Sequence, residues 1–507
     1  MTNEIWNLPV LPQGWVWTDF ESISGELKAG GTPLTKVKKY YDDGTIPFVK
    51  IEDIVSSSKY LFETKTNITE QGLRNSSAWL VPRGSLLYSM YASYGEPIIN
   101  KIEVTTSQAI IAYVPLQGLI VLDYVYYYLK KVRTELTTRG TTQKNLNAQI
   151  VRRIPIPLAP FNEQVRIVAK LEELFTRLDA GVEGLRKVKA QLKRYRQAVL
   201  KYAFEGKLTE EWRKTHKHET EPATKLLERI GRQIEINVKG KRKKSSRMDM
   251  PLNQELSEGW TCGRLEDWIY IAGRIGWRGL KAGEYTSEGP LFLSVYNLNK
   301  GIKVDFSEAQ HITEERYEES PEIQLQNNDI LLVKDGAGIG KIGIVEGLNT
   351  KATVNSSLLV IRGSDVFLPK FLLYFLMGPK MQEVVKMRIT GSATPHLFQR
   401  DIKRFDVLIP PIAEQQKVVE SIESSFSVAD EVENTIKQGL RQAEALRQSI
   451  LRDAFQGKLV PQDSSDEPAD KLLERIREEK AKSKGKKDTN RGRKNKPKQL
   501  ELSTYVK

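Results

Sequence analysis

The sequence contains a single cysteine, Cys262, and four histidines among its 507 residues. One cysteine cannot build a disulfide framework or a cysteine-based zinc site, and a reducing cytoplasm is the simplest location. No apolar run approaches the roughly 20 residues that cross a bilayer. The opening MTNEIWNLPV lacks the basic and apolar regions of a secretory signal. We therefore expect a cytoplasmic chain without membrane contact, with three or four domains at roughly 150 residues each.

A nucleotide-binding loop is also missing. The segment Gly338–Gly343 satisfies the pattern G-x-G-x-x-G, but a dinucleotide site needs a helix directly after the glycines. Ile342–Val345 has the composition of a strand instead, so a glycine-rich hairpin is the better interpretation. Ile342 also stands where a phosphate-binding loop would carry Ser or Thr for magnesium.

The motifs of a methyltransferase, a nuclease and a metal centre are absent as well. The only Pro-Pro pair, Pro410-Pro411, lies between Ile409 and Ile412, so the Asp/Asn-Pro-Pro-aromatic motif of an adenine methyltransferase is missing. His216 and His218 lie in a polar stretch without partner ligands, and no convincing nuclease carboxylate cluster is present. We expect no catalytic residue, no metal and no cofactor bound by this chain.

Positive charge is abundant but unevenly placed. The net charge is +14, and Lys239–Asp249 contributes +5 and Lys480–Lys498 contributes +9, so the rest of the chain is formally neutral. Nucleic acid is one partner for such segments, and solvated disordered tails explain them equally well. Base reading, if the chain does it, must come from local patches on near-neutral domains.

The chain is an internal duplication. Matching segments recur in the same order at an offset of 251 residues, changing to 245–246 near the ends of the copies. The matching pairs are Leu11–Trp15 with Leu256–Trp260, Pro160–Gln164 with Pro411–Gln415, Ala203–Leu208 with Ala454–Leu459, and Lys225–Ile230 with Lys471–Ile476. Residues 160–230 and 411–476 match well, whereas 20–135 and 265–385 do not. A shared framework that carries two different reading domains would have this pattern.

The shared part predicts two long helices. Apolar residues recur at spacings of three and four, which is typical of a seam between helices. The two series are Val168, Leu171, Phe175, Leu178, Val182, Leu185, Leu192, Val199 and Ala203, and Val419, Ile422, Phe426, Ala429, Ile436, Leu440, Ala443, Ile450 and Ala454. Prolines precede each helix and a glycine, Gly206 or Gly457, follows it. A two-fold relation between the copies would pair the helices antiparallel, as a rod of roughly 60–65 Å that separates two readers.

The variable parts predict compact α/β domains. In the first, Ile46–Ile51 and Gly84–Tyr88 are strand-like and Leu122–Glu135 is a predicted helix. In the second, Leu291–Val295 and Asp329–Val333 are strand-like and Leu368–Lys386 is one predicted helix. Glycine-rich, aromatic and basic loops between these elements carry the side chains that read guanine, adenine and phosphate. Any single loop residue can equally be an exposed polar residue without a ligand.

Two dissimilar domains that alternate with two similar helices resemble the specificity subunit of type I restriction–modification systems over nearly the whole chain. The pairs Glu163-Gln164 and Glu414-Gln415 and both Gly-Lys-Leu segments carry the resemblance. The loop Gly140–Leu146 also resembles the family signature, and the second copy departs from it, with Thr394-Pro-His in place of Gln-Lys-Asn.

The resemblance implies a mixed α/β (α+β) fold with a pseudo-two-fold internal repeat, in which two target-recognition domains alternate with two long helices paired as an antiparallel coiled coil. We expect recognition domains at 1–155 and 253–408, helical spacers at 156–236 and 409–479, a basic linker at 237–252 and a basic disordered tail at 480–507. The implied partners are double-stranded DNA with a split site, two adenine-methyltransferase subunits and, in some assemblies, two restriction subunits. S-adenosylmethionine, ATP and magnesium would belong to those subunits.

The predicted DNA-contacting residues come from the loops of both variable domains. They are Lys28, Thr32, Lys50, Arg83, Tyr88, Ser89, Tyr91, Ser93, Tyr94, Arg139, Thr141, Thr142, Gln143, Lys144 and Asn145, and in the second domain Arg274, Arg278, Tyr296, Lys334, Asp335, Lys341, Arg388, Thr390, Ser392, Thr394 and His396. The predicted partner-binding residues are Glu163, Gln164, Phe204, Lys207, Leu208, Glu414, Gln415, Phe455, Lys458 and Leu459.

Two other function classes stay open on sequence alone. The chain could be an enzyme that methylates or cuts DNA itself, or a coiled-coil scaffold that reads no bases. Substitution of Arg139 and Lys334 distinguishes the enzyme from a DNA-recognition subunit, because loss of the choice of DNA site supports recognition of bases by this chain. Equal affinity for every duplex would favour the scaffold.

Overall fold

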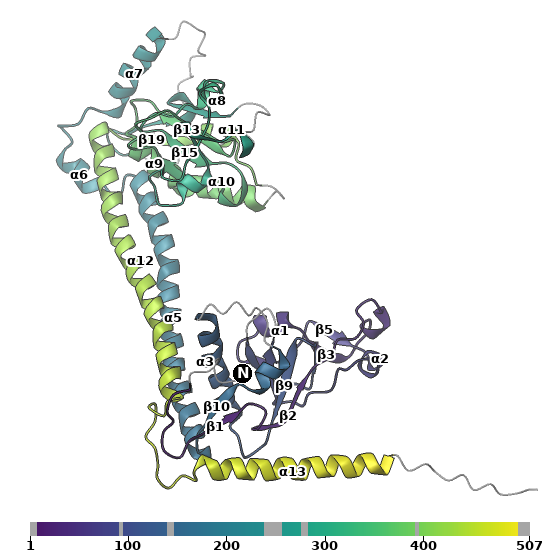
Figure 1. Ribbon diagram of the computed structural model, residues 1–507. Coiled ribbons are helices and arrows are strands. Elements are labelled where there is room, and N and C mark those ends of the chain that lie inside the picture. The colour runs from purple at the N-terminus through teal and green to yellow at the C-terminus, as the bar shows by residue number, and fades with distance from the viewer. Residues whose placement is uncertain are drawn as a thin grey trace, which may run out of the picture. The chain divides into compact units, whose positions relative to one another are not determined.

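The computed structural model describes residues 8–90, 95–138, 147–237, 256–274, 282–390 and 395–494 (Figure 1). The chain divides into two compact units, one formed by residues 1–185 with 438–507 and the other by residues 186–437. Each unit therefore holds one variable domain together with a part of each shared helix.

The variable domain of the first unit contains a five-stranded sheet in the order β2-β9-β6-β7-β4 and a three-stranded sheet in the order β5-β3-β8. The strands are β2 (Ser24–Ala29), β3 (Ile46–Val49), β4 (Tyr60–Leu61), β5 (Thr66–Ile68), β6 (Leu86–Ser89), β7 (Pro97–Asn100), β8 (Thr105–Thr106) and β9 (Ile110–Pro115). Between the two sheets lies a core that includes Val49, Leu87, Ile98 and Ala112. The strand-like runs at Ile46–Ile51 and Gly84–Tyr88 are thus confirmed.

The second variable domain repeats this arrangement although its sequence differs. A four-stranded sheet has the order β12-β18-β15-β16, and a three-stranded sheet has the order β14-β13-β17. The strands are β12 (Ile269–Gly273), β13 (Thr286–Leu293), β14 (Gln310–His311), β15 (Ile330–Val333), β16 (Ile342–Ile344), β17 (Ala352–Val354) and β18 (Leu358–Gly363). In both small sheets the middle strand has one parallel and one antiparallel neighbour. Because β16 follows the glycine-rich segment, the hairpin interpretation is confirmed and the dinucleotide-binding pattern has no helix.

Helices on the variable domains show one departure from prediction. Helix α3 (Leu122–Thr138) matches its predicted start, but the single helix predicted over Leu368–Lys386 is wrong. It is two helices, α9 (Pro369–Met377) and α10 (Pro379–Thr390), with Gly378 in an extended conformation between them. Pro379 explains the break, because a proline disfavours helical geometry at the residue before it and cannot donate a backbone hydrogen bond. The short helices are α1 (Ile51–Ser56), α2 (Glu70–Arg74), α4 (Ala148–Arg152), α8 (Glu314–Glu318) and α11 (Gln399–Lys403).

The two long helices form as predicted. Helix α5 spans Phe161–Phe204 and α12 spans Ile412–Ala454. At about 1.5 Å per residue each is about 65 Å long. Gly206 and Gly457, just beyond the helix ends, adopt φ of 73° and 66°. This left-handed geometry favours glycine and terminates a helix.

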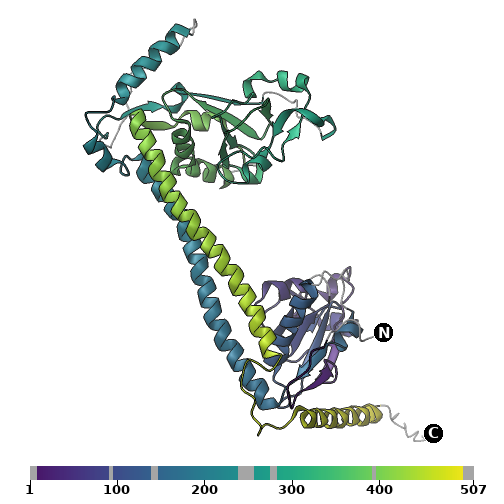
Figure 2. The same ribbon diagram turned by 60° about the vertical axis from the view of Figure 1, so that its left-hand side comes forward.

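Contacts within each unit show that α5 and α12 run antiparallel (Figure 2). In the first unit Arg447 pairs with Asp179, and a methyl group added at Gly439 would lie 3.1 Å from Leu185 Cδ1. In the second unit Arg196 pairs with Asp430 at 2.6 Å and with Glu433 at 3.0 Å. In the first unit, the α12 partner of Leu185 precedes that of Asp179 in the sequence, so the two helices run in opposite directions and the predicted antiparallel pair is confirmed.

A short antiparallel strand pair attaches each variable domain to the start of a long helix. In the first unit β1 (Val16–Asp19) pairs with β10 (Pro155–Leu158), which leads into α5. In the second, β11 (Thr261–Arg264) pairs with β19 (Asp406–Ile409), which leads into α12. The chain therefore enters and leaves each variable domain at one place.

The end of each long helix packs on the variable domain that the other copy encodes. Phe204 of α5 lies 5.2 Å from Phe371 and 5.4 Å from Phe375 between ring centroids. Phe455, after α12, lies 5.1 Å from Tyr124 and 5.0 Å from Tyr128. Each unit is consequently built from both copies of the duplication.

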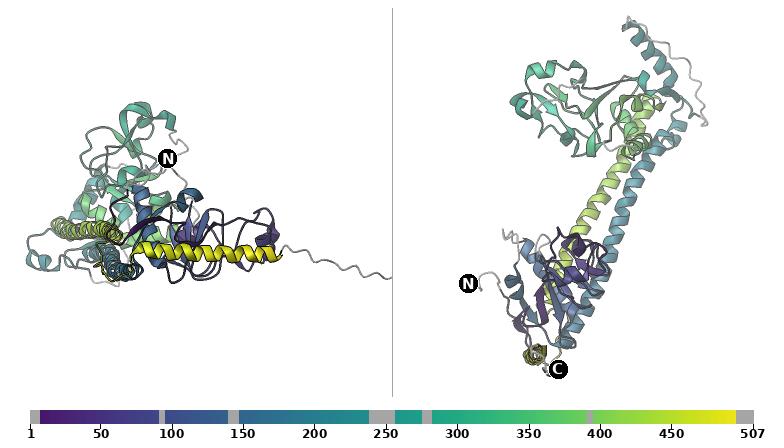
Figure 3. Two further views of the ribbon diagram at one scale, coloured as in Figure 1. Left: turned by 60° about the horizontal axis from the view of Figure 1, so that its bottom comes forward. Right: turned by 90° about the vertical axis from the view of Figure 1, so that its right-hand side faces the viewer.

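The repeated Lys-Leu-Leu-Glu-Arg-Ile segments lie in α7 (Ala223–Asn237) and α13 (Ala469–Lys494), after the short helix α6 (Glu210–Thr215) in the first copy. Ala223 N donates to Gly259 O at 3.0 Å and Ala469 N donates to Gly14 O at 2.8 Å. The apolar side of α13 joins the core of the first unit through Leu472 and other residues, and the helix lies along that unit in Figure 3. It continues to Lys494, so helix extends into the segment that was predicted to be disordered.

Candidate nucleic-acid interface

The Glu-Gln pair at the start of α5 joins the first variable domain to the helix. Trp15 Nε1 donates to Glu163 Oε2 at 2.9 Å. Gln164 accepts from Val121 N at 3.1 Å and donates to Ala159 O at 2.9 Å. Glu163 and Gln164 are 1% and 0% exposed.

The second copy repeats this joint with more partners. Trp260 Nε1 donates to Glu414 Oε2 at 2.8 Å, while Arg213 Nε and Thr209 Oγ1 donate to Glu414 Oε1 at 2.9 and 2.7 Å. Gln415 accepts from Leu368 N at 2.9 Å. Both joints hold a variable domain at a defined place on its helix.

These contacts give the framework motifs a role inside the chain, and their contact with a partner subunit stays a prediction. Glu163, Gln164, Glu414 and Gln415 are at most 1% exposed, and each makes hydrogen bonds within the chain, although Glu163 Oε1 has no hydrogen-bond partner among the residues described. The aromatic residues Phe204 and Phe455 likewise pack internally. Of the remaining predicted partner residues, Leu208 and Leu459 are half-buried and Lys207 and Lys458 are exposed. Burial of a motif at a domain joint explains its repetition as well as subunit contact does, and sequence alone does not separate the two.

A second joint uses equivalent acids on the helices and non-equivalent lysines on the domains. Glu172 accepts from Lys59 at 2.7 Å, and its counterpart Glu423 accepts from Lys370 at 2.7 Å. Lys59 precedes β4, whereas Lys370 lies on α9. Asp123 also contacts Lys59 at 2.6 Å. Although burial lowers the pKa of Lys59, these two carboxylates hold it above its usual range. The framework thus accepts two different domains at one helix position.

Many of the predicted DNA-contacting residues lie outside the residues that the structure describes. They are Tyr91, Ser93, Tyr94, Arg139, Thr141, Thr142, Gln143, Lys144, Asn145, Arg278, Ser392 and Thr394, and of Thr390 only the helical backbone is described.

Two residues of the first domain that are predicted to contact DNA are buried. Tyr88 and Ser89 are both 0% exposed because they lie on the central strand β6 rather than in a loop. The Tyr88 ring packs 6.5 Å from Phe20, and burial raises the pKa of its hydroxyl. The Ser89 hydroxyl accepts from Glu96 N at 3.0 Å.

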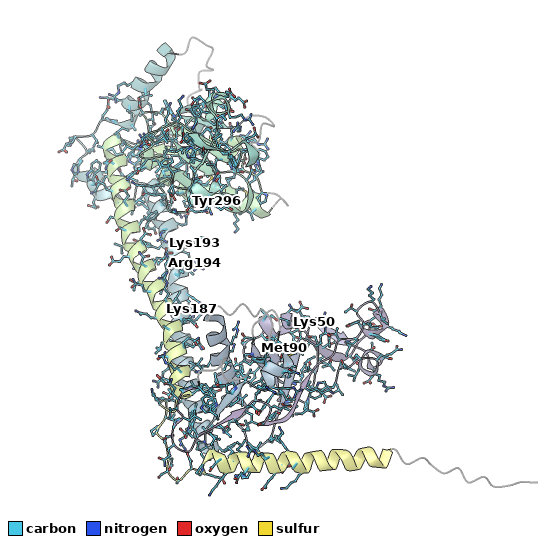
Figure 4. The ribbon with its side chains drawn as sticks, viewed as in Figure 1. Lys50, Met90, Lys187, Lys193, Arg194 and Tyr296 are labelled. Carbon is cyan, nitrogen blue, oxygen red and sulfur yellow. The ribbon has the colours of Figure 1, made fainter. Side chains whose placement is uncertain are left out.

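Four predicted contacts in the first domain lie at the surface. Lys28 is exposed and its Nζ lies 5.2 Å from the Trp79 ring, and Arg83 is exposed before β6. Thr32 is half-buried. Lys50 is half-buried at the start of α1, where its backbone N donates to Asp53 Oδ2 at 2.8 Å. Figure 4 labels Lys50 and Met90, and the latter is 3% exposed at the end of β6.

The structure gathers four predicted residues of the second domain into a cluster. Asp335, after β15, forms a backbone bridge and a side-chain hydrogen bond with His396, and Lys334 Nζ lies 3.7 Å from Asp335. Arg388 at the end of α10 pairs with Asp401 at 2.5 Å. In the sequence these residues belong to two separate loops, and the structure brings the loops together.

Phe398 links this cluster and was missed. Its ring lies 4.5 Å from the ring of His396, and the guanidinium groups of Arg388 and Arg400 lie 5.1 and 4.7 Å from its centroid. The side chain is 40% exposed, which is unusual for phenylalanine. Its position directly after Thr394-Pro-His-Leu was the available signal. An exposed aromatic ring between two arginines suits contact with DNA.

The remaining predicted residues of the second domain differ in exposure. Tyr296 is 78% exposed, and Lys341 donates to Asn299 Oδ1 at 2.7 Å. Arg274 is only 8% exposed, and none of its guanidinium nitrogens has a hydrogen-bond partner in the part of the chain that the structure describes. Burial and the nearby Arg316 lower the pKa of Arg274. Tyr296 and Arg274 both line a pocket of about 690 Å³ with Tyr285 and Phe292.

Basic residues also lie on α5 in the second unit. Figure 4 labels Lys187, Lys193 and Arg194 along this helix. Lys193 and Arg194 are exposed. Apolar periodicity reveals only the seam of the helix, so it gives no signal for these basic side chains.

Within the described ranges, no three His, Cys, Asp or Glu residues come together in a way that could hold a metal ion. None of the helices described is long and apolar enough to cross a membrane.

Known proteins resemble this chain along most of its length. The model of the type I restriction modification DNA specificity domain matches residues 21–189 and 283–442. The EcoBI specificity subunit of Escherichia coli is 30% identical over 362 residues, which are 69% of each chain. The EcoKI specificity subunit of Escherichia coli K12 is 23% identical over 499 residues, covering 94% of this chain and 98% of the relative.

The fold is found in a solved structure as well. A chain solved in work on complex assembly and conformational transition of the type I R-M system superposes with a TM-score of 0.64 at 16% identity, covering 89% of this chain and all of the other. Two variable domains of one topology on paired antiparallel helices, together with the match of the family model to both copies, show that this chain belongs to the family of type I restriction–modification DNA specificity subunits.

Proposed function

We propose that this chain reads a split DNA site and directs adenine methylation that other subunits perform. Each variable domain reads one half-site, and the paired helices fix the distance between the halves. The observation that carries this proposal is one β topology, repeated in two domains, that presents different residues at corresponding loops. Two recognition domains that share one fold but differ in sequence suit a DNA target with two different half-sites separated by a spacer.

The second domain offers the more complete reading surface among the described residues. Arg388, Arg400 and Lys334 supply donors for guanine or phosphate, and Phe398 supplies an apolar ring for a thymine methyl group or a sugar. His396 is oriented by its contact with Asp335 through Nδ1, so its Nε2 is left to form a hydrogen bond with DNA. In the first domain, Lys28 and Arg83 supply exposed cations.

Catalysis is delegated in this proposal. Two methyltransferase subunits bring S-adenosylmethionine and flip the target adenine, since its amino group cannot be methylated inside the base stack. Restriction subunits, with ATP and magnesium, join in some assemblies. This chain contributes positioning, and Lys207, Lys458 and the exposed faces of α7 and α13 are the framework surfaces left for subunit contact.

The test is an adenine-methylation map of a methylation-free host that expresses this chain with its methyltransferase subunit. A single interrupted motif, methylated on both strands and absent without this chain, supports the proposal. Unchanged methylation by an assembled complex would contradict it. Arg388→Gln should alter one half of the motif and leave the other half intact, whereas a scaffold would show no change at either half.

A further inference from the structure

One stretch of α5 carries positive charge that no acidic residue of the stretch itself compensates. From Arg186 to Lys201 there are seven basic residues and no acidic residue. Near its end, Arg196 pairs with Asp430 and Glu433 of α12. Four other basic residues of the stretch are exposed and have no carboxylate within 4 Å among the residues described, namely Arg186, Lys189, Lys193 and Arg194.

This stretch concentrates exposed basic residues that have no acid beside them. Elsewhere on the long helices several basic residues pair with acids three or four positions away, as Lys170 and Arg177 do with Glu173. Among the residues described, the exposed Arg441 and Arg452 of α12 also have no carboxylate within 4 Å, but they lie eleven positions apart. Like charges at these spacings destabilise a helix by about 0.2–0.5 kcal/mol per pair. Arg186 with Lys189 and Lys189 with Lys193 have this spacing. The stretch therefore costs helix stability, and packing against α12 does not explain it because these side chains are exposed.

The second copy does not share the feature. The positions equivalent to Arg186, Lys189, Lys193 and Arg194 are Lys437, Leu440, Glu444 and Ala445. Lys437 pairs with Glu433 at 3.3 Å, and Glu444 adds a negative charge. The framework is thus asymmetric at a place where its duplication would make it symmetric.

We propose that Lys189, Lys193 and Arg194 bind phosphates of the DNA spacer between the two half-sites, on the side of the half-site read by the second domain. The inference rests on the proposed function. The residues lie past the middle of α5, within the second unit, and outside the variable domain that reads bases (Figure 4). Double-stranded DNA carries one negative charge per about 1.7 Å of its axis. The cluster extends over about 7.5 Å of helix, so it can face several phosphates at once.

The consequence is affinity without sequence information. Phosphate contacts position a protein on the duplex and carry no base readout. The helix would tether the spacer on one side only and so distinguish the two directions of an asymmetric site. An acidic surface of a partner subunit is the competing occupant.

The experiment uses the full chain assembled with its methyltransferase subunits and a duplex that contains the mapped site. The test variant is Lys189→Gln/Lys193→Gln/Arg194→Gln, which keeps good helix formers. The control variant, Lys170→Gln/Lys214→Gln/Lys417→Gln, removes the same charge from one exposed and two half-buried lysines that form ion pairs.

Loss of three phosphate contacts lowers the slope of log Kobs against log salt by about 2.7. The ratio of wild-type affinity to variant affinity for the duplex should therefore fall about 40-fold when the salt concentration rises from 50 to 200 mM. The methylated motif stays the same, and ethylation interference in the spacer disappears on one side only. The control variant should keep the wild-type slope.

An unchanged salt slope with the wild-type interference pattern would overturn the inference. Loss of subunit assembly with unchanged DNA affinity would also overturn it, in favour of an acidic protein surface. A wild-type complex that selects no split site would instead contradict the proposed function, so the two failures are distinguishable.

Discussion

The indole of Trp15 donates a hydrogen bond to the Glu163 carboxylate, 148 positions away in the chain, and the same bond joins Trp260 to Glu414 in the second copy. The two joints differ in what else the carboxylate holds. Glu414 also accepts from Arg213 and Thr209, which follow the end of α5. In the second unit one carboxylate therefore ties together the start of the variable domain, the start of α12 and the segment after α5.

This difference predicts unequal costs for one substitution. Glu163→Ala leaves the buried Trp15 N–H without a partner and should lower the free energy of unfolding by about 1–3 kcal/mol. Glu414→Ala leaves the Arg213 guanidinium without its buried partner and should cost about 3–5 kcal/mol. Calorimetric unfolding of the two variants measures both values. Equal losses would contradict a larger contribution of Glu414 to stability.

Glu163 also predicts a pH dependence of stability. Burial raises the pKa of its carboxyl above the ordinary 4.5, against the opposing effect of the Trp15 hydrogen bond. Between 4.5 and the raised pKa the folded chain holds a proton that the unfolded chain has released, so stability falls as pH rises, by at most about 1.4 kcal/mol per pH unit.

Glu163→Gln removes this titration and keeps an acceptor for Trp15. The stability of wild type relative to Glu163→Gln should therefore decrease as pH rises from 4.5 and level off above the raised pKa. Chemical unfolding at a series of pH values gives the comparison. A difference that increases with pH would show that the carboxylate is stabilised by the fold.

How far the sequence predicts this structure depends on the range of the contacts. The seam of α5 and α12 follows from local periodicity, and Gly206 and Gly457 mark the helix ends through backbone geometry. The strands of both variable domains are short apolar runs, and their common topology depends on pairings between distant segments, such as β3 with β8. No local pattern encodes those pairings.

The candidate site was harder to predict for a related reason. Tyr88 and Ser89 stand where the predicted strand ends and polar and aromatic residues begin, yet β6 continues through Ser89 and buries both side chains. The Glu-Gln motifs carry the resemblance to the specificity subunits, and that resemblance does not distinguish a buried joint from an interface with another subunit. The exposed ring of Phe398 lies close to both Arg388 and Arg400, and Arg388 is ten positions away on another helix, so no local pattern predicts this arrangement.

Arg274 predicts an opposite response of stability and binding. The Arg274 guanidinium is buried, has no hydrogen-bond partner among the residues described and lies 6.0 Å from the Phe292 ring. A buried charge without hydrogen bonds costs stability, so Arg274→Met should leave the unfolding temperature of the second unit unchanged or raise it. If the guanidinium turns into the adjoining pocket to meet DNA, the same variant loses affinity. Loss at one base pair identifies guanine as the contact, and a uniform loss with a lower salt slope identifies phosphate.

Arg362→Met is the contrasting variant for this test. Arg362 makes two hydrogen bonds to Asp329, at 2.6 and 2.7 Å, and Asp329 is 0% exposed. Its removal should lower the unfolding temperature clearly. If Arg274→Met also lowers the unfolding temperature and leaves DNA binding unchanged, Arg274 is a structural residue.

The paired helices predict the spacing of the half-sites in the target. Insertion of about 21 residues in heptad pattern into both helices, after Leu185 in α5 and after Lys437 in α12, keeps the seam in phase and lengthens the pair by about 32 Å. This is close to one turn of DNA, about 34–36 Å, so both domains should again face the same side of the duplex. The methylated motif should keep its two half-site sequences with a spacer longer by about 9–10 base pairs.

Insertion into one helix alone breaks the alignment of Arg196 with Asp430 and should abolish methylation. Methylation at the original spacing by the doubly extended chain would show that the helices do not measure the distance.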